Sequence, residues 1–347
     1  MSHSFTSKHD TAQDGFTLVE LLVGMVIGLF LMAVLVQLFL SNKQAYRLQE
    51  QLARAQENGR FALEFVSRDL RQADFWGCAQ PGAVQNLLDA DGDASDNGWD
   101  EAGSGFDLME AGNLLGIKGP PGGYHVAAAA ANVAGLPNAD AVTIVGATGM
   151  PAQVAATMAG IASPVTIATN PEGIAPGDRV IVSDCQGGDL FMVTNDTDGN
   201  PLTLEHASTA GNDNASGSLQ RTYDATAQVY PVQSVTYSVD VSNGVPVLRR
   251  SDISNANQPV VEGVEKIRVL FGEDTSGDGT ANRHVTINNV TDLTAVVSAR
   301  IWVMVRTDGE INDAPLPVTF AGTTITPTDR RSRRVFTSTI SLRNRLL

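Results

Sequence analysis

The chain has 347 residues, of which 43% are hydrophobic and 18% charged, and its formal net charge is −15. This length and composition predict a folded protein of one large domain or two small ones, with a sizeable core. A surface this acidic repels phosphate backbones, so direct nucleic-acid binding is not expected.

The N-terminal forty residues contain a polar segment followed by a long apolar run. Residues 1–15 are polar, and the almost unbroken apolar stretch from Phe16 to Leu40 follows them. A helix of that length spans a bilayer, so residues 16–40 are expected to form a transmembrane half-helix. A secretory signal peptide would have a shorter apolar core ending in small residues, whereas Ser41, Asn42 and Lys43 follow here.

One charge, Glu20, interrupts the apolar run. A carboxylate in hydrocarbon costs about 3 kcal/mol, so Glu20 either has a partner or reaches the nearby interface. The string GFTLVELL at 15–22 resembles the cleavage signal of type IV prepilins and pseudopilins. The resemblance implies that residues 1–15 are a leader that a membrane peptidase removes after Gly15. It also implies that the same enzyme methylates Phe16, and that Glu20 docks onto the terminal amine of a neighbouring subunit.

The helix is expected to continue beyond the membrane as an amphipathic half over residues 41–75. This stretch lacks proline, and apolar residues recur at spacings of three and four, which indicates a helix with one face packed on a globular head. That face is predicted to consist of Leu48, Leu52, Ala55, Gly59, Ala62, Leu63, Val66 and Leu70.

Several segments resemble a narrower group, the PilW-type minor pilins. They are QENGRFALE at 56–64, RDLRQA at 68–73, WGC at 76–78, GDRVIVSDC at 177–185 and LFMV at 190–193. The resemblance is dense over residues 15–80 and patchy beyond. The J-type pseudopilins of type II secretion are similar but have shorter heads.

The resemblance implies a minor pilin that primes type IV pilus assembly at or near the fibre tip. Its implied partners are the other minor pilins, the major pilin and the prepilin peptidase. Before assembly it would sit in the inner membrane of a Gram-negative bacterium with its head in the periplasm, and afterwards in the fibre at the cell surface. A J-type pseudopilin and a pilus-tip adhesin are the alternatives.

Residues 76–347 are expected to form a head rich in strands and loops, with long polar loops at 79–140 and 307–333. A helix followed by strands predicts an α+β fold, with the helix packed on an antiparallel sheet. The expected strands are Ala141–Val145, Arg179–Ser183, Leu190–Thr194, Val229–Val241, Pro246–Arg250, Val264–Phe271, Val296–Arg306 and Val335–Leu342.

The two cysteines, Cys78 and Cys185, are expected to form a disulfide. An acidic chain with a membrane segment at its start and a polar body suggests export, and exported proteins form disulfides. Both residues follow elements that we expect to pack together.

Two acidic loops have the spacing of calcium ligands. In residues 89–100, Asp89, Asp91, Asp93, Ser95, Asn97 and Asp100 occupy positions 1, 3, 5, 7, 9 and 12 of a calcium loop, although Ala94 replaces the usual glycine. In residues 274–282, the corresponding residues are Asp274, Ser276, Asp278 and Asn282, with Gly279 in place but no terminal acid. A shorter loop lies at 195–200. The alternative is a turn, because Asp, Asn and Gly favour turn geometry.

No catalytic function is expected. The five histidines are scattered, and the sequence has no zinc-protease, P-loop or nucleophile-elbow motif. The C-terminal segment instead carries a run of arginines, either a basic patch for an acidic partner subunit or solvent-facing residues of a final strand. They are Arg330, Arg331, Arg333, Arg334, Arg343 and Arg345.

Overall fold

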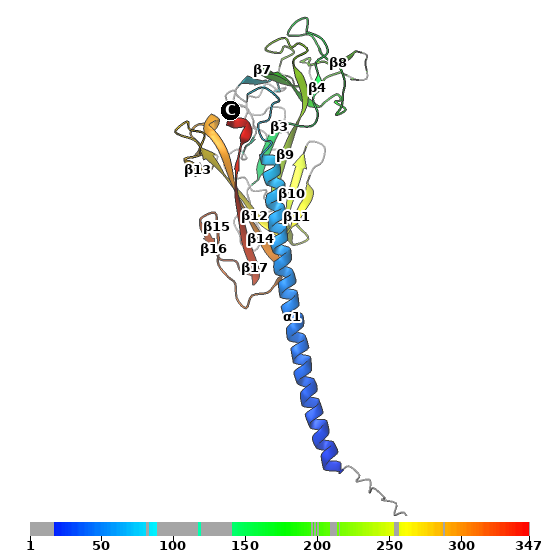
Figure 1. The fold of residues 1–347 in the computed structure, drawn as a ribbon, viewed down its shortest axis with the longest axis vertical. Helices are drawn as coiled ribbons and strands as arrows, with labels where there is room; N and C mark the ends of the chain where they lie inside the picture. Colours follow the sequence, from blue (N-terminus) through cyan, green and yellow to red (C-terminus); the bar gives the residue numbers. More distant parts are fainter. Residues whose placement is uncertain are drawn as a thin grey trace, which may run out of the picture. The chain divides into compact units, whose positions relative to one another are not determined.

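The structure is a computed structural model of the chain. It describes residues 17–80, 83–88, 117–118, 141–195, 197, 199, 201–208, 214, 216–252, 257–286 and 289–346. The described residues form a single α-helix, α1 (Leu18–Leu70), and then a head built mainly of strands (Figure 1). The expected α+β class is therefore confirmed.

The strands are β1 (Val84–Asn86), β2 (Ile117–Lys118), β3 (Val142–Ala147), β4 (Ala152–Gln153), β5 (Val165–Ile167), β6 (Arg179–Asp184), β7 (Gly187–Met192), β8 (Leu202–Leu204), β9 (Gln228–Ser242), β10 (Val245–Asp252), β11 (Gln258–Glu262), β12 (Val264–Glu273), β13 (Arg283–Val285), β14 (Val296–Glu310), β15 (Val318–Phe320), β16 (Thr323–Ile325) and β17 (Arg331–Ser341). The short 3-10 helices η4 (Leu293–Ala295) and η5 (Arg343–Arg345) complete the set.

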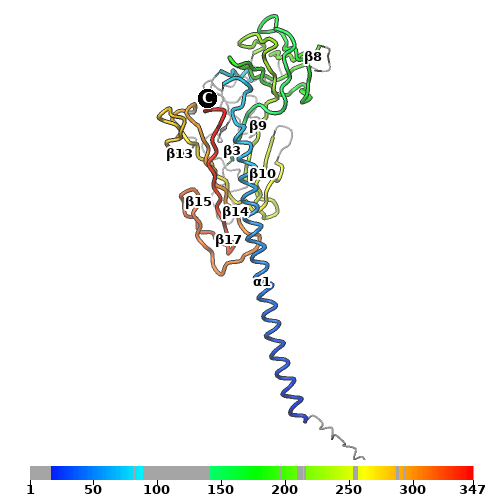
Figure 2. Tube along the Cα trace, in the orientation of Figure 1, coloured from blue at the N-terminus to red at the C-terminus, as the bar shows by residue number. Residues whose placement is uncertain are grey.

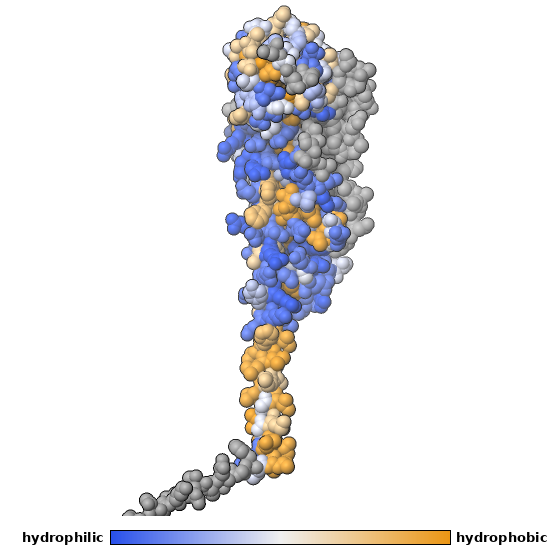
Figure 3. Space-filling model, turned by 90° about the vertical axis from the view of Figure 1, so that its right-hand side faces the viewer, coloured by the Kyte–Doolittle hydropathy of each residue, from blue (hydrophilic) through white to orange (hydrophobic). Residues whose placement is uncertain are grey.

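Helix α1 divides between two compact units, residues 1–51 and residues 52–347. Residues 18–40 of this helix are exposed and mostly apolar, and Figure 3 shows the lower part of the helix largely in the hydrophobic colours. The most apolar 18-residue window has a mean hydropathy of 2.7, enough to cross a membrane.

The second part of α1 buries one face in the head. Ala55, Gly59, Ala62, Val66 and Leu70 are buried, as their spacing predicts. The predicted stripe is wrong at its start, because the Leu48 side chain remains exposed. Toward its end, the buried face also takes in two polar residues, Ser67 and Asp69.

Two sheets pack against this face, and their described strand pairs are antiparallel except for β1 with β7, which is parallel. The larger sheet runs in the order β1-β7-β6-β9-β10-β11, and the smaller one in the order β13-β12-β14-β17. Buried side chains of β9, β10, β12, β14 and β17 join those of α1 in one core. On β14 the alternation of a strand places Ala299, Ile301, Val303 and Val305 in this core.

A second lobe carries cores of its own. Strands β1 and β4 to β8, with the start of β9, enclose two further hydrophobic clusters, one around Phe191 and Tyr223 and one around Trp76 and Leu190. Figure 1 shows β4, β7 and β8 at the end of the head beyond the C-terminus of α1.

The expected loop at 307–333 is partly a folded element. Strands β15 and β16 form a hairpin within it, and Phe320 and Ile325 pack onto Met304 of the smaller sheet. The Nζ atom of Lys266 lies 5.7 Å from the centroid of the Phe320 ring. The outer face of this sheet is therefore covered where Met304 lies.

Candidate functional site

The helix begins with a reciprocal cap made by Thr17 and Glu20. A Glu20 carboxylate oxygen, Oε2, accepts hydrogen bonds from the backbone N–H and the hydroxyl of Thr17, both at 2.9 Å. The backbone N–H of Glu20 in turn donates to the Thr17 hydroxyl at 3.3 Å. This is a capping box, which satisfies N–H groups that have no partner within the helix.

The capping box supplies a partner for the carboxylate within the chain. Of the two carboxylate oxygens, Oε2 takes both bonds, and no donor from the described part of the chain reaches Oε1. The threonine-x-x-glutamate spacing before an apolar run is a known helix-start signal, and sequence reasoning missed it here. Gly15 and Phe16 lie outside the described residues.

A close contact fixes the helix against the smaller sheet. A Cβ atom at Gly59 would lie 2.1 Å from the Phe336 ring, so only glycine fits while that ring keeps its place. The amide of Asn58 donates to the Glu262 carbonyl at 3.0 Å. Figure 2 shows the C-terminal strand running beside this part of the helix.

The end of the helix is held by buried polar contacts. The Tyr237 hydroxyl donates to the Asp69 carboxylate at 2.7 Å. Burial and this acceptor raise the pKa of Tyr237, so it stays a neutral donor. After the helix, Asp74 accepts from Trp76 at 3.1 Å and pairs with Arg345 at 3.1 Å, where the Arg345 side chain is buried.

A buried ionic network lies on β12 and β17. The Glu265 side chain is fully buried, and Arg333 donates to it twice, at 2.7 and 2.9 Å. Arg306 approaches the same carboxylate at 3.3 Å and donates to the Gly244 carbonyl at 2.8 Å. Arg333 also makes a two-pronged pair with Asp329.

Most of the C-terminal arginines are therefore structural. Arg333 and Arg345 are buried in ion pairs, while Arg330 pairs with Glu310 and Arg331 with Asp329. Neither sequence interpretation, a basic patch or a row of solvent-facing residues, describes the buried Arg333 and Arg345. Of the six arginines, Arg330, Arg334 and Arg343 are exposed, and Arg330 pairs with Glu310.

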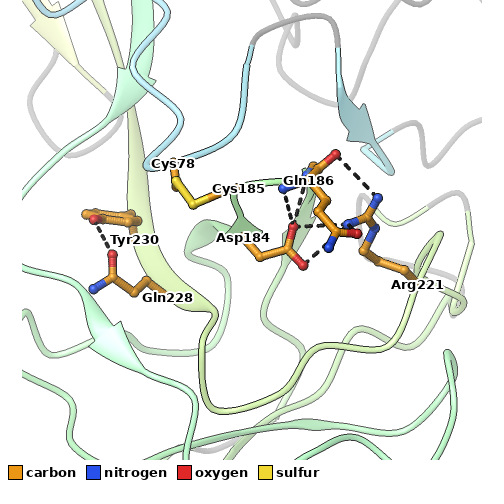
Figure 4. Close-up of a disulfide and its surroundings, with 8 residues drawn as sticks. Cys78, Asp184, Cys185, Gln186, Arg221, Gln228 and Tyr230 are labelled. Atoms are coloured by element: carbon orange, nitrogen blue, oxygen red, sulfur yellow. Dashed lines mark hydrogen bonds and ion pairs between the residues drawn. A yellow bond between two sulfur atoms is a disulfide. The ribbon is translucent and has the colours of Figure 1, made fainter.

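The structure joins Cys78 to Cys185 across 107 positions of sequence, with their Cα atoms 4.6 Å apart. The bond connects the segment after α1 to the tight turn between β6 and β7. Beside it, Asp184 accepts from the Gln186 and Gly187 backbone N–H groups and pairs with Arg221 at 3.0 Å (Figure 4). The disulfide thus attaches the helix end to the second lobe.

The loop at 274–282 uses its oxygens internally. The Asp274 carboxylate accepts the backbone N–H groups of Ser276, Gly277 and Gly279 at 2.6–2.9 Å. Desolvation opposes ionisation of Asp274, but these donors outweigh it and lower its pKa. Asn282 likewise accepts from the Thr275 backbone N–H at 2.6 Å. These bonds are those of an Asx-type turn, the alternative that the sequence left open.

Two further calcium predictions fall wholly or partly outside the described residues. Asp89, Asp91, Asp93, Asn97 and Asp100 lie in the undescribed range, as do Asp196, Asp198 and Asn200 of the shorter loop. Within the described ranges, no three His, Cys, Asp or Glu side chains gather in a way that suits a metal ion. Calcium binding stays a prediction at these loops.

Two histidines lie in the described head. His206 is buried, and its Nε2 atom lies 3.0 Å from the Ser163 carbonyl. His284 is partly buried with its Nε2 atom 3.4 Å from the Ser298 hydroxyl. The structure does not bring these two histidines together.

Comparison with known proteins gives two family matches. Residues 236–344 match the family model of the type IV pilus-assembly protein W, and residues 10–36 match the prokaryotic N-terminal methylation motif. The first match covers the strands from within β9 to η5, including the whole smaller sheet. The second covers the GFTLVELL string at 15–22 and the start of α1.

No curated protein matches the chain. Among solved structures, it is similar to a type IV-like pilin from Thermus thermophilus, at 17% identity and a TM-score of 0.21. That match covers 33% of this chain and 66% of the other, just under two thirds of its length.

Proposed function

We propose that this chain, a type IV pilin-class protein with a PilW-family domain, is a low-copy minor pilin that primes pilus assembly at or near the fibre tip. The size of the head carries the proposal. The unit from Leu52 to Leu347 contains a second lobe outside the family-matched region, with cores of its own. Repeating such a head at every subunit step would crowd a fibre, whereas one copy at an end meets no such limit.

Deletion of the gene tests the priming role. Surface fibres should fall sharply while the major pilin stays stable in the membrane, and the chain should be scarce in sheared fibres. Equal abundance of this chain and the major pilin would contradict the proposal. Normal fibres that have lost surface attachment would favour the tip adhesin, for which the second lobe supplies extra surface. Location of the gene among type II secretion genes would favour the J-type pseudopilin.

The assembly chemistry that we propose begins with cleavage after Gly15 and methylation of Phe16. N-terminal sequencing of fibre-associated protein should begin at Phe16, and a bulky residue in place of Gly15 should block the cut. Cleavage there leaves the Thr17 amide N–H intact, so the capping box survives processing. The precursor would sit in the inner membrane with its head in the periplasm, where the prepilin peptidase and other pilins would meet it.

Docking through Glu20 is the next step of the proposal. Oε2 caps the chain's own helix, and Oε1 is left to accept the terminal ammonium of a neighbouring subunit. An ammonium and a carboxylate attract strongly in low dielectric, where each satisfies the other.

Glu20→Gln separates charge from capping, because glutamine also completes a capping box. We expect Glu20→Gln and Glu20→Ala to reduce incorporation into fibres alike, by roughly tenfold if about 1.4 kcal/mol of pairing is lost. The measurement is the ratio of fibre-bound to membrane-bound chain. Thr17→Ser, which keeps the cap, is the matched control. Normal incorporation of Glu20→Gln would show that the carboxylate serves only as a cap.

We also propose calcium as an optional ligand of residues 89–100 or 274–282. Calorimetry of the detergent-solubilised chain with and without chelator measures it, and Asp93→Asn and Asp278→Asn assign any heat to a loop. In the described loop, calcium would have to displace main-chain N–H donors from Asp274. No heat and no change of melting temperature would leave the turn as the sole interpretation.

A further inference from the structure

The last strand of the head has a free edge. In the smaller sheet, β17 pairs with β14, and no other described strand pairs with it. Its register with β14 runs without a shift from Ser341 to Arg333. An open, regular edge of this kind presents unpaired main-chain groups to any strand that approaches.

One hydrogen bond determines which residues face that edge. The Leu342 N–H donates to the Val297 carbonyl at 2.9 Å, on the β14 side. Because alternate residues of an antiparallel strand point their main-chain groups to the same side, Ile340, Ser338 and Phe336 also face β14. The N–H and C=O groups of Val335, Thr337, Thr339 and Ser341 therefore face outward. No main-chain hydrogen bond from the described part of the chain reaches them.

Between Arg333 and Ser341 the edge lacks features that protect other edge strands from pairing, such as short length, proline and bulges. β17 spans eleven residues and contains no proline. The edge strand β11 of the larger sheet spans five and carries Pro259. The side chains of Thr337, Thr339 and Ser341 are exposed and suited to strands. Length, regularity and residue type thus make β17 the more open of these two edges.

The charges that flank the edge select its partner. Residues 330–347 contain no acidic residue, and two exposed arginines, Arg334 and Arg343, lie near the two ends of the free edge. A third exposed arginine, Arg330, is paired with Glu310. Two copies of β17 paired antiparallel would place Arg334 of one copy near Arg343 of the other. Such like-charge pairing is unfavourable, which excludes a second copy as the best partner.

We propose that the free edge of β17 takes up an edge strand from the head of a different pilin subunit. That strand would have uncharged, strand-forming residues in its middle and acidic residues toward its ends. Main-chain hydrogen bonds would provide the attachment, and the arginines would fix its register. This inference rests on the proposed function, because it assumes a pilin neighbour.

Proline at position 339 tests the edge directly. Thr339→Pro removes an outward-facing N–H donor and leaves the ladder to β14 intact, which edge strands tolerate. Both Thr339→Pro and Thr339→Val lose the hydrogen bond that Arg300 donates to the Thr339 hydroxyl. Thr339→Val keeps the backbone N–H donor, so it is the matched control. In cells making the full chain, we expect Thr339→Pro to lower fibre incorporation at least fivefold, and Thr339→Val to leave it unchanged. The amount of disulfide-bonded chain in the membrane should be equal in both.

A surface charge reversal keeps the test decisive if the proline variant fails to fold. Arg334→Glu with Arg343→Glu should reduce incorporation without changing the amount of folded chain. A photo-crosslinking residue at position 337 should capture a strand of another pilin with flanking Asp or Glu, as read by mass spectrometry. The same residue at Gln258 on β11 should capture none.

The outcomes separate the two proposals. Normal incorporation of both the proline and the charge-reversal variants, or capture of a helix instead of a strand, would overturn the edge pairing. If gene deletion still abolished fibres in that case, the priming function would stand without it. If deletion left fibres normal, the priming function itself would fail.

Discussion

Replacing Cys78 and Cys185 together by serine is expected to lower the free energy of unfolding by about 4–5 kcal/mol. The disulfide closes a loop of 107 positions. A cross-link over so long a loop lowers the conformational entropy of the unfolded chain, which accounts for a stabilisation of this size. Both cysteines are exposed, so serine leaves no buried polar group and the loss reports the cross-link alone. Small domains are often stable by only about 5–15 kcal/mol, so the head should become marginal.

Denaturant unfolding of the detergent-solubilised chain measures this loss. Adding a reductant to the native chain should reproduce the midpoint of the double-serine variant, and the reductant should not affect the variant itself. Two free thiols in non-reducing mass spectrometry of the exported protein would contradict the pairing. A change below about 1 kcal/mol would show that the reduced chain keeps its ends together by other contacts.

Glu265→Gln is expected to cost about 3–5 kcal/mol, because it removes the carboxylate from Arg306 and one of the two carboxylates from Arg333, which keeps Asp329. The Arg333 side chain is only 1% exposed and that of Arg306 only 8%, so water cannot replace the lost partner. The effect should appear as a lower denaturation midpoint of the full chain.

Glu310→Gln is the matched control for this prediction. Glu310 contacts Arg330 at 3.0 Å, a distance between the 2.7 and 3.3 Å of the two buried contacts of Glu265. In the Glu310–Arg330 pair, however, both side chains are about half exposed. Exposed pairs contribute under about 1 kcal/mol, so the control should change stability little. Replacing Glu265 and Arg333 together by methionine should recover part of the loss. Equal effects of Glu265→Gln and Glu310→Gln would show that water reaches the buried network.

Much of the fold could be predicted from periodicity alone. All eight expected strands appear in the structure, because each carries a run of β-branched or aromatic residues that is long enough to recognise. The other nine described strands were not predicted, and all of them except the five-residue β11 have only two or three residues, too few to carry a measurable period. They are β1, β2, β4, β5, β8, β11, β13, β15 and β16. The hairpin between β9 and β10 turns at Asn243-Gly244, both with positive φ, and this strong turn signal was available but not used.

The polar interior could not be predicted in the same way. A sequence shows that Arg333 and Arg345 are charged, but only the fold shows that Glu265 and Asp74 lie opposite them, far away in the chain. For the same reason, the predicted apolar stripe of the helix does not include Asp69, which is buried and accepts a hydrogen bond from Tyr237. The Asp274 loop shows the limit of spacing motifs, because the same residues suit both a cation and a turn.

The segment after β17 contacts the C-terminal end of the helix, although 271 positions of sequence separate Asn344 from Ala73, and this determines when the head can finish folding. Asn344 donates to the Ala73 carbonyl at 2.9 Å, and Arg345 pairs with Asp74 just after the helix. Strand β17 supplies Ile340 to the same core as the helix, and Leu342 follows it there. A segment late in the head is thus needed to close the core around a helix that comes before the head. A chain exported only as far as β16 therefore lacks the strand that seals its helix, and the core can close only after β17 has followed.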